Sequence, residues 1–297
     1  MMRNASPAAA QAMLCFSLSC LVFTVSLFSS SVLGFTSELW ALTYWGPGLY
    51  FCLLNFVLRY SLKGFTYDVA VRSAFLGSAF ATGLYFATFD SYHIFGLYAM
   101  AFSMFHFSEF LSVALTNPRT LTVDSFILNH SVQYWVAAVS SWVEAAVENY
   151  FFPGMKTVFW LSHIGVVLCI GGEVMRKLAM FTAKTNFNHH VQTVKSPDHR
   201  LVTHGVYRVC RHPSYVGWFY WSIGTQLILL NPICVLIYTL VSWSFFRERI
   251  FAEEMFLISF FGSQYLDYQK KVGTGLPFIR GYLPDGTGAC FIKHNSY

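Results

Sequence analysis

The 297-residue chain has little charge: only 11% of its residues are Asp, Glu, Lys or Arg, whereas 55% are hydrophobic. A water-soluble globule usually carries about 25% charged residues, and a chain with so few cannot cover a surface that faces water. The shortage of charge therefore excludes an ordinary soluble domain. It indicates an integral membrane protein.

The chain also lacks the residue spacings of disulfide and metal sites. None of its seven cysteines forms a CxxC pair, and five of them fall within long apolar runs, where a thiol behaves as a small apolar group. Histidines gather between His189 and His212, but no HxxxH, HExxH or Cys/His pairing fixes a tetrahedral zinc site. We expect neither disulfides nor a bound metal.

Long apolar runs dominate the chain. About 20 apolar residues in a helix cross the hydrocarbon core, and these runs lack the short alternation of barrel strands. We therefore expect an all-α, polytopic transmembrane protein with about eight spans. The expected spans cover residues 13–33, 41–58, 71–89, 92–116, 126–147 and 157–174, followed by a stretch over 215–246 that is long enough for two.

The first apolar run follows Arg3 and has a second interpretation as a cleaved signal peptide. The run is longer than a typical signal core, and no convincing small-residue cleavage site precedes the next run. We therefore interpret it as the first span.

The C-terminal apolar stretch is interrupted by Asn231 and Pro232. Because proline lacks a backbone donor, a helix must bend or stop there, which predicts a tight hairpin of two helices. Beyond it, apolar and charged positions are mixed over residues 246–279. This pattern predicts one helix that leaves the eighth span, lies at the interface and ends at residues 273–277.

Basic residues indicate the orientation, because Lys and Arg collect on the cytoplasmic side of membrane proteins. With a cytosolic N-terminus and eight spans, 18 of the 19 Lys and Arg fall on the cytosolic side and only Lys156 falls opposite. Both termini are then cytosolic. The net charge of +5 suits anionic lipid headgroups or carboxylate substrates and gives no reason to invoke nucleic acid.

Residues 211–218, RHPSYVGW, open the seventh span and have two interpretations. The first is a helix start at the membrane edge, with an early proline and interfacial Tyr215 and Trp218. The second is an anion or cofactor site, because free N–H groups at a helix N-terminus lie beside Arg211 and His212. The residues alone leave both open.

Arg249 and Glu253 lie four residues apart and share one helix face. An ordinary surface ion pair would stabilise that helix by a few tenths of a kcal/mol, about 0.2–0.5. The alternative is that this polar face lines a cavity, because ionisable groups near the end of a span are usually retained for function.

A dense set of motifs over residues 177–280 resembles the isoprenylcysteine carboxyl methyltransferases of animal cells. The set comprises residues 189–192, the run HRLVTHGVYRVCRHPSYVGWFYWSIGTQ, then NPIC, RxxxEE, FGxxYxxY and TGLPFI. RHPxYxG alone is also found in phospholipid methyltransferases and sterol reductases. Its combination with RxxxEE and TGLPFI is much more selective.

The resemblance implies methyl transfer from S-adenosylmethionine to the free α-carboxylate of a C-terminal farnesyl- or geranylgeranyl-cysteine. The substrates would be processed CaaX proteins such as Ras-like GTPases and lamins. The reaction would take place at the cytosolic face of the endoplasmic reticulum membrane. Residues 1–175 would then form six spans that act as scaffold and lipid access. Residues 176–297 would form the connector, hairpin and C-terminal helix of the methyltransferase active site.

The resemblance also assigns individual residues. Arg249 takes the position of the contact with the substrate carboxylate, which makes it the expected catalytic and substrate-binding residue. The expected contacts with the cofactor fall on Gln192, His199, Arg200, Leu201, Val202, Tyr207, His212, Pro213, Ser214, Tyr215 and Glu253.

Three other functions compete with this one. A phospholipid N-methyltransferase would share the cofactor residues, but its acceptor is an amine, and Arg249 would be an unfavourable neighbour. A sterol reductase would use a nicotinamide cofactor and normally has more spans. A non-catalytic receptor or transporter would use its basic face only to hold anionic lipid.

Overall fold

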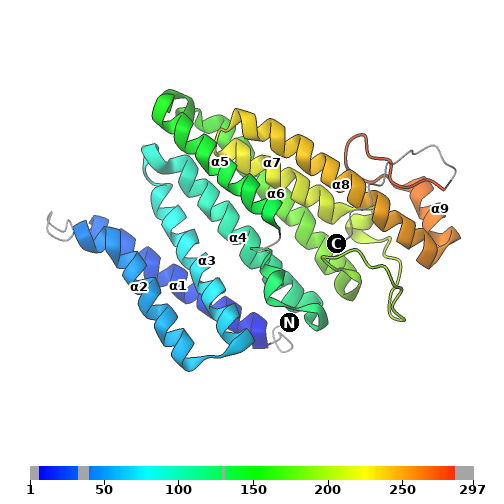
Figure 1. The fold of residues 1–297 in the computed structure, drawn as a ribbon, viewed down its shortest axis with the longest axis horizontal. Coiled ribbons are helices and arrows are strands. Elements are labelled where there is room, and N and C mark those ends of the chain that lie inside the picture. The colour runs from blue at the N-terminus through cyan, green and yellow to red at the C-terminus, as the bar shows by residue number, and fades with distance from the viewer. Residues whose placement is uncertain (1–6, 33–39, 129–130, 285–297) are drawn as a thin grey trace.

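The computed structural model describes residues 7–32, 40–128 and 131–284, and every regular element in that part of the chain is helical (Figure 1). The α-helices are α1 (Pro7–Val32), α2 (Trp40–Ser61), α3 (Gly64–Phe86), α4 (His93–Thr116), α5 (Val132–Phe151), α6 (Phe159–Ala183), α7 (Pro213–Ile228), α8 (Pro232–Phe261) and α9 (Ser263–Lys271). Short 3-10 turns are η3 (Asp90–Tyr92), η4 (Pro118–Thr120), η5 (Val123–Phe126), η6 (Pro153–Thr157), η7 (Lys184–Asn186) and η8 (Gly205–Arg208). The all-α prediction is confirmed.

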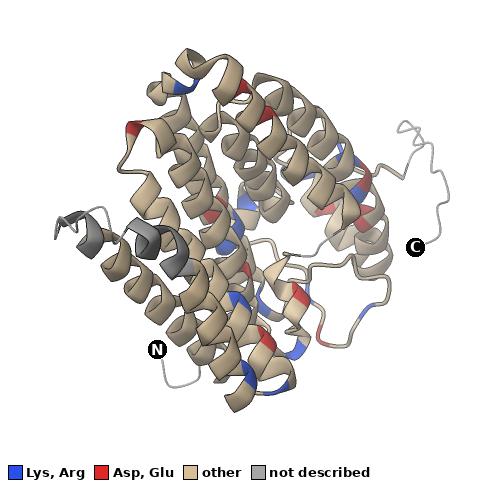
Figure 2. Ribbon diagram, turned by 60° about the vertical axis from the view of Figure 1, so that its left-hand side comes forward, with Lys and Arg blue, Asp and Glu red and all other residues tan. Residues whose placement is uncertain are grey.

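Helices α1 to α8 follow the predicted spans in order and lie side by side as a bundle (Figure 1). Within the described residues, three helical stretches are long and apolar enough to cross a membrane: Pro7–Phe28, Gly64–Phe86 and Asp90–Thr116. In Figure 2 most of the blue Lys and Arg segments lie in the central, lower and right-hand parts of the view, and long stretches of the helices carry no charged residue. The chain is a membrane protein by this pattern, while the count of eight spans stays a prediction.

Helices α6 and α7 approach closely because glycines face each other along their crossing. A Cβ added at Gly172 would lie 2.5 Å from the carbonyl oxygen of Gly217, and one added at Gly217 would lie 2.4 Å from that of Gly172. Seven residues away along each helix, a Cβ at Gly165 would lie 2.7 Å from the carbonyl oxygen of Gly224. Backbone contact of this kind is typical of helix pairs in membranes. It fixes the start of α7 against the end of α6.

The predicted hairpin is present, since α7 ends at Ile228 and α8 begins at Pro232. The buried ammonium group of Lys156 holds the turn by donating to Glu148 Oε2 at 2.7 Å, to the carbonyl oxygen of Leu229 at 2.8 Å and to Asn231 Oδ1 at 3.1 Å. We call this cluster the Lys156 clamp. It ties α5 and η6 to the α7–α8 turn.

Glu144 of α5 reinforces the same end of the bundle. Its carboxylate accepts hydrogen bonds from the backbone N–H groups of Ile233 and Cys234, both at 2.8 Å. These donors belong to the first turn of α8, where no intrahelical partner exists. A carboxylate there also complements the positive end of the helix dipole.

Several predicted helix boundaries are wrong, and two of them bear on the site. The helix expected over residues 246–279 is broken at Gly262, whose φ of 55° lies in the left-handed region, and α9 ends at Lys271. The sixth span, expected to end at residue 174, continues as α6 to Ala183. That extension buries Arg176, which is only 1% exposed.

Candidate active site

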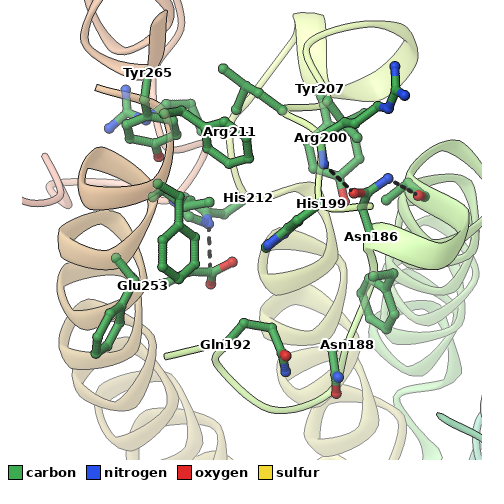
Figure 3. Close-up of a pocket in the computed structure, with 18 of the residues that line it drawn as sticks. Asn186, Asn188, Gln192, His199, Arg200, Tyr207, Arg211, His212, Glu253 and Tyr265 are labelled. Atoms are coloured by element: carbon green, nitrogen blue, oxygen red, sulfur yellow. Dashed lines mark hydrogen bonds and ion pairs between the residues drawn. The ribbon is translucent and has the colours of Figure 1, made fainter. Parts of the chain in front are cut away.

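A cavity lies where the 184–212 connector, the start of α7, the end of α8 and α9 meet, and we call it the donor cavity. Figure 3 shows Glu253 and His212 on one side of it, His199 and Asn186 across from them, and Gln192 and Asn188 along the connector. All eleven residues expected from the resemblance to contact the cofactor line this cavity: Gln192, His199, Arg200, Leu201, Val202, Tyr207, His212, Pro213, Ser214, Tyr215 and Glu253. Residues separated by up to 61 positions thus meet at one place, which the sequence motifs alone do not require.

Glu254 anchors the α8 side of the donor cavity. This fully buried carboxylate accepts hydrogen bonds from Arg211 Nε at 2.8 Å, His212 Nε2 at 3.0 Å, Tyr265 Oη at 3.0 Å and Gln269 Nε2 at 2.9 Å. A buried charge is stable only when it is paired and hydrogen-bonded, and Glu254 satisfies both conditions. It therefore joins the start of α7 to α9 and fixes the ring of His212.

Arg211 extends this anchor to the C-terminal segment. Its guanidinium donates to the carbonyl oxygens of Gln269 at 3.2 Å, of Val272 and of Arg280 at 3.0 Å. Backbone hydrogen bonds from Arg211 to Gly273 at 2.8 Å and from His212 to Thr274 at 3.2 Å add to it. The segment after α9 is held against the start of α7 by these contacts.

Arg249 lies outside the donor cavity and lines a second cavity, which we call the acceptor cavity. The wall of the acceptor cavity has apolar members, among them Val113, Ile127 and Trp218, and polar members that include Asp124. The two cavities are neighbours because they share five lining residues: Phe187, Asn188, His190, Ser214 and Tyr215.

Tyr215 connects the charged groups of the two cavities. Arg249 Nε donates to its hydroxyl oxygen at 3.0 Å, and the hydroxyl donates to Glu253 Oε2 at 2.6 Å. No ion pair joins Arg249 directly to Glu253, although both belong to the described part of α8. The surface ion pair considered from their spacing is therefore absent, and the alternative, a polar face that lines a cavity, is observed.

Arg176 of α6 lines the acceptor cavity and forms a buried charge pair with Glu109 of α4. Arg176 grips Glu109 with both ends of its fork, at 2.6 Å from Nε to Oε1 and 2.7 Å from Nη2 to Oε2. The remaining Nη1 donates to Ser214 Oγ at 2.6 Å, and Lys177 also contacts Glu109. The buried pair thus supports a residue that lines both cavities.

Burial keeps two connector histidines neutral at neutral pH. It lowers the pKa of His199 below the usual 6.5, and the charge of nearby Lys195 lowers it further. Burial likewise lowers the pKa of His189, although its ring lies 3.0 Å from Glu109 Oε2. Of these two, His199 lines the donor cavity, where its neutral ring adds no positive charge opposite Glu253.

Several residues that shape the site were not among the residues to which the resemblance assigned a contact. Arg211 and Glu254 were visible inside the quoted RHPxYxG and RxxxEE motifs, and Tyr265 and Tyr268 inside FGxxYxxY. Glu109 carried only the signal of an ionisable residue within a span, which gives no partner. The donor cavity also has wall residues outside every quoted motif: Ala183, Asn186, Phe187, Asn188, Phe256, Leu257 and Phe260.

Comparisons with known proteins agree on one family. Residues 165–259 match the model of the isoprenylcysteine carboxyl methyltransferase (ICMT) family. The protein-S-isoprenylcysteine O-methyltransferase of Tribolium castaneum is 57% identical over 76% of this chain and 82% of its own length. The Xenopus laevis enzyme of that name is 51% identical over 90% and 93%, and the human one is 52% identical over 81% and 85%.

A solved structure agrees with these relatives. It is that of a eukaryotic intramembrane Ras methyltransferase, ICMT, with a TM-score of 0.89 and 51% identity, and the match covers 94% of this chain and all of the other. At such identity over most of both chains, the likeness extends beyond the fold to the family. The chain belongs to the isoprenylcysteine carboxyl methyltransferase family of membrane enzymes.

Proposed function

We propose that the protein transfers a methyl group from S-adenosylmethionine to the C-terminal α-carboxylate of farnesyl- or geranylgeranyl-cysteine, giving a methyl ester. The observation that carries this proposal is the adjacency of two cavities that share Tyr215, one with the carboxylate of Glu253 and one with the guanidinium of Arg249. An anionic acceptor suits the second cavity, whereas the amine acceptor of a phospholipid N-methyltransferase does not.

The donor cavity fits S-adenosylmethionine by its chemistry. Apolar and aromatic side chains, among them Leu201, Val202 and Tyr265, suit the adenine ring, and the Glu253 carboxylate suits ribose hydroxyls or a cationic group. When bound, the cofactor supplies an electrophilic methyl group on sulfur. The eleven cavity residues named above would hold it.

The chain's task at the acceptor is orientation. A terminal carboxylate has a pKa of about 3.5, so it is an anion at cytosolic pH and needs no general base. The planar fork of Arg249 would hold one carboxylate oxygen and leave the other directed at the donor cavity. Bringing reacting atoms to about 3–3.5 Å in line is the main source of rate acceleration in such a site.

The prenyl group would add affinity through burial. Each buried methylene contributes about 0.8 kcal/mol, and the acceptor cavity has apolar wall residues at Val113, Ile127 and Trp218. Substrates would be prenylated CaaX proteins, including Ras-like GTPases and lamins. An unprenylated cysteine peptide is expected to react with a far lower kcat/KM.

We further propose the setting that the basic residues and the resemblance imply. The protein would cross the endoplasmic reticulum membrane about eight times, with both termini and the site on the cytosolic face. Residues 1–175 would serve as scaffold and lipid access, and residues 176–297 would build the active site. Helix α6 crosses this boundary and contributes Arg176 to the site.

One assay tests the reaction. Membranes that contain the protein receive labelled S-adenosylmethionine with farnesylated or unprenylated cysteine peptide, and base-labile methyl ester is measured. We expect ester on the farnesylated peptide only. Label on a lipid amine instead, or equal kcat/KM for both peptides, would contradict the proposal.

A further inference from the structure

Arg249 and Glu253 have the spacing of an ion pair but do not form one. Residues four apart on a helix are neighbours, and opposite charges at that spacing normally attract. In the described α8, the hydroxyl of Tyr215 occupies the place between them, 3.0 Å from Arg249 Nε and 2.6 Å from Glu253 Oε2. A side chain from α7 thus separates two charges of α8.

Two neighbouring rings stack against the ring of Tyr215 and hold its hydroxyl in this place. The ring of His212 stacks against it, with centroids 5.6 Å apart and planes within 7°. Phe246 stacks against it with centroids 5.2 Å apart and planes within 28°. His212 is itself held by Glu254, and Phe246 is buried in α8.

The guanidinium of Arg249 is oriented by its hydrogen bonds. Nε donates to Tyr215, and Nη2 donates to the carbonyl oxygen of His189. Within the described residues, Nη1 has no hydrogen-bond partner, although Arg249 lines the acceptor cavity. An arginine in this state retains an N–H for an incoming carboxylate.

We propose that Tyr215 is a positioning residue that keeps Arg249 and Glu253 apart, so that the arginine stays available to the acceptor carboxylate and the glutamate to the methyl donor. This role rests on the proposed function. Without the hydroxyl, the guanidinium and the carboxylate would pair along α8. Each would then be withdrawn from its own ligand.

Four variants separate this role from a simple loss of a hydrogen bond. Tyr215→Phe keeps the stacked ring and removes only the hydroxyl, while Tyr220→Phe makes the same change at an exposed position of α7 as a control. Glu253→Gln removes the charge that would capture Arg249. The fourth variant combines Tyr215→Phe with Glu253→Gln.

The measurement is the KM of N-acetyl-S-farnesylcysteine with the purified protein, at a donor concentration that saturates each variant. We expect Tyr215→Phe to raise this KM about tenfold in the wild-type background, the usual effect of a hydrogen bond to a charged group. In the Glu253→Gln background the same change is expected to raise KM less than about threefold, because no carboxylate can capture Arg249. If Tyr215→Phe raises KM by the same factor in the wild-type and Glu253→Gln backgrounds, the proposal is overturned.

The reciprocal experiment uses the other ligand and does not require the Tyr215→Phe single variant. Affinity for S-adenosylhomocysteine is compared between Arg249→Gln and the combination of Arg249→Gln with Tyr215→Phe, and we expect less than about a threefold difference. A tenfold loss would contradict the separating role. Wild-type protein that forms no methyl ester contradicts the proposed function, whereas active wild type with equal ratios contradicts only the role of Tyr215.

Discussion

Replacement of Arg249 by lysine tests whether the guanidinium does more than supply a positive charge. Lysine keeps the charge and a similar length, but it has one nitrogen in place of three. In the wild-type site, Nε and Nη2 are occupied by Tyr215 and the carbonyl oxygen of His189, which leaves Nη1 for the acceptor. A single ammonium group cannot keep both anchors and still orient a carboxylate.

The expected magnitude follows from those contacts. A hydrogen bond that involves a charged group contributes about 1.5–3 kcal/mol, and lysine would keep the charge and some of the bonding. A net loss of about 2–4 kcal/mol in transition-state stabilisation corresponds to about a 30- to 700-fold fall in kcat/KM. Most of it should appear in kcat, because a loosely held carboxylate is rarely aligned with the methyl group.

The assay measures methyl ester formation on farnesylated cysteine, together with S-adenosylhomocysteine binding and thermal unfolding. Arg247→Lys is the matched control, because Arg247 is exposed and lies two residues away on α8. We expect Arg249→Lys to retain the unfolding temperature and the affinity for S-adenosylhomocysteine. Activity within about threefold of wild type, less than the loss of one hydrogen bond, would refute the orienting role of the fork.

Three further predictions concern other parts of the molecule. Glu109→Gln leaves buried Arg176 without its counter-charge, so we expect about 3–5 kcal/mol of destabilisation, seen as a lower unfolding temperature in detergent; an unchanged temperature would contradict the buried pair. Lys156→Met should lower the free energy of unfolding by about 3–5 kcal/mol, because it leaves the buried Glu148 carboxylate without its counter-charge. Adding Glu148→Gln should restore part of that stability, and no restoration would argue against the ion pair. Since burial lowers the pKa of His199 below 6.5, its ring is neutral at pH 7 and gains a proton as the pH falls below 6.5, adding positive charge near the cationic donor. Affinity for S-adenosylmethionine should therefore fall as the pH is lowered from 7.5 to about 5.5, and it should fall less steeply in His199→Asn. If affinity depends on pH in the same way in wild type and variant, His199 is not the group responsible.

The sequence predicted those parts of the fold that depend on local pattern. Apolar length gave the order of the eight long helices, and Asn231 with Pro232 gave the hairpin, because both signals act within one or two turns. The eleven residues assigned by resemblance also line one cavity. Motifs of that density carry spatial information that hydropathy does not.

The sequence did not predict features that arise between distant segments. Arg176 was counted with the polar connector, because nothing near it shows that Glu109, 67 positions earlier, lies within 2.6 Å. Lys156 was only the one basic residue on its side of the membrane, yet four acceptors surround it. The break at Gly262 was not predicted for a different reason: an isolated glycine is tolerated inside a helix as well as at its end, so it does not show where a helix stops.

The Lys156 clamp lies at one end of α7, and the residues that separate donor from acceptor lie at the other. With 16 residues at about 1.5 Å each, α7 is a rod of about 24 Å that joins the Lys156 clamp to the two cavities. A tilt of about 2.5° about the clamped end would shift the start of α7 by about 1 Å, a misplacement that costs about a hundredfold in rate where alignment governs the reaction. Substitutions at the end of α7 that lies away from the two cavities, such as at Asn231, would then slow methyl transfer without contacting either ligand.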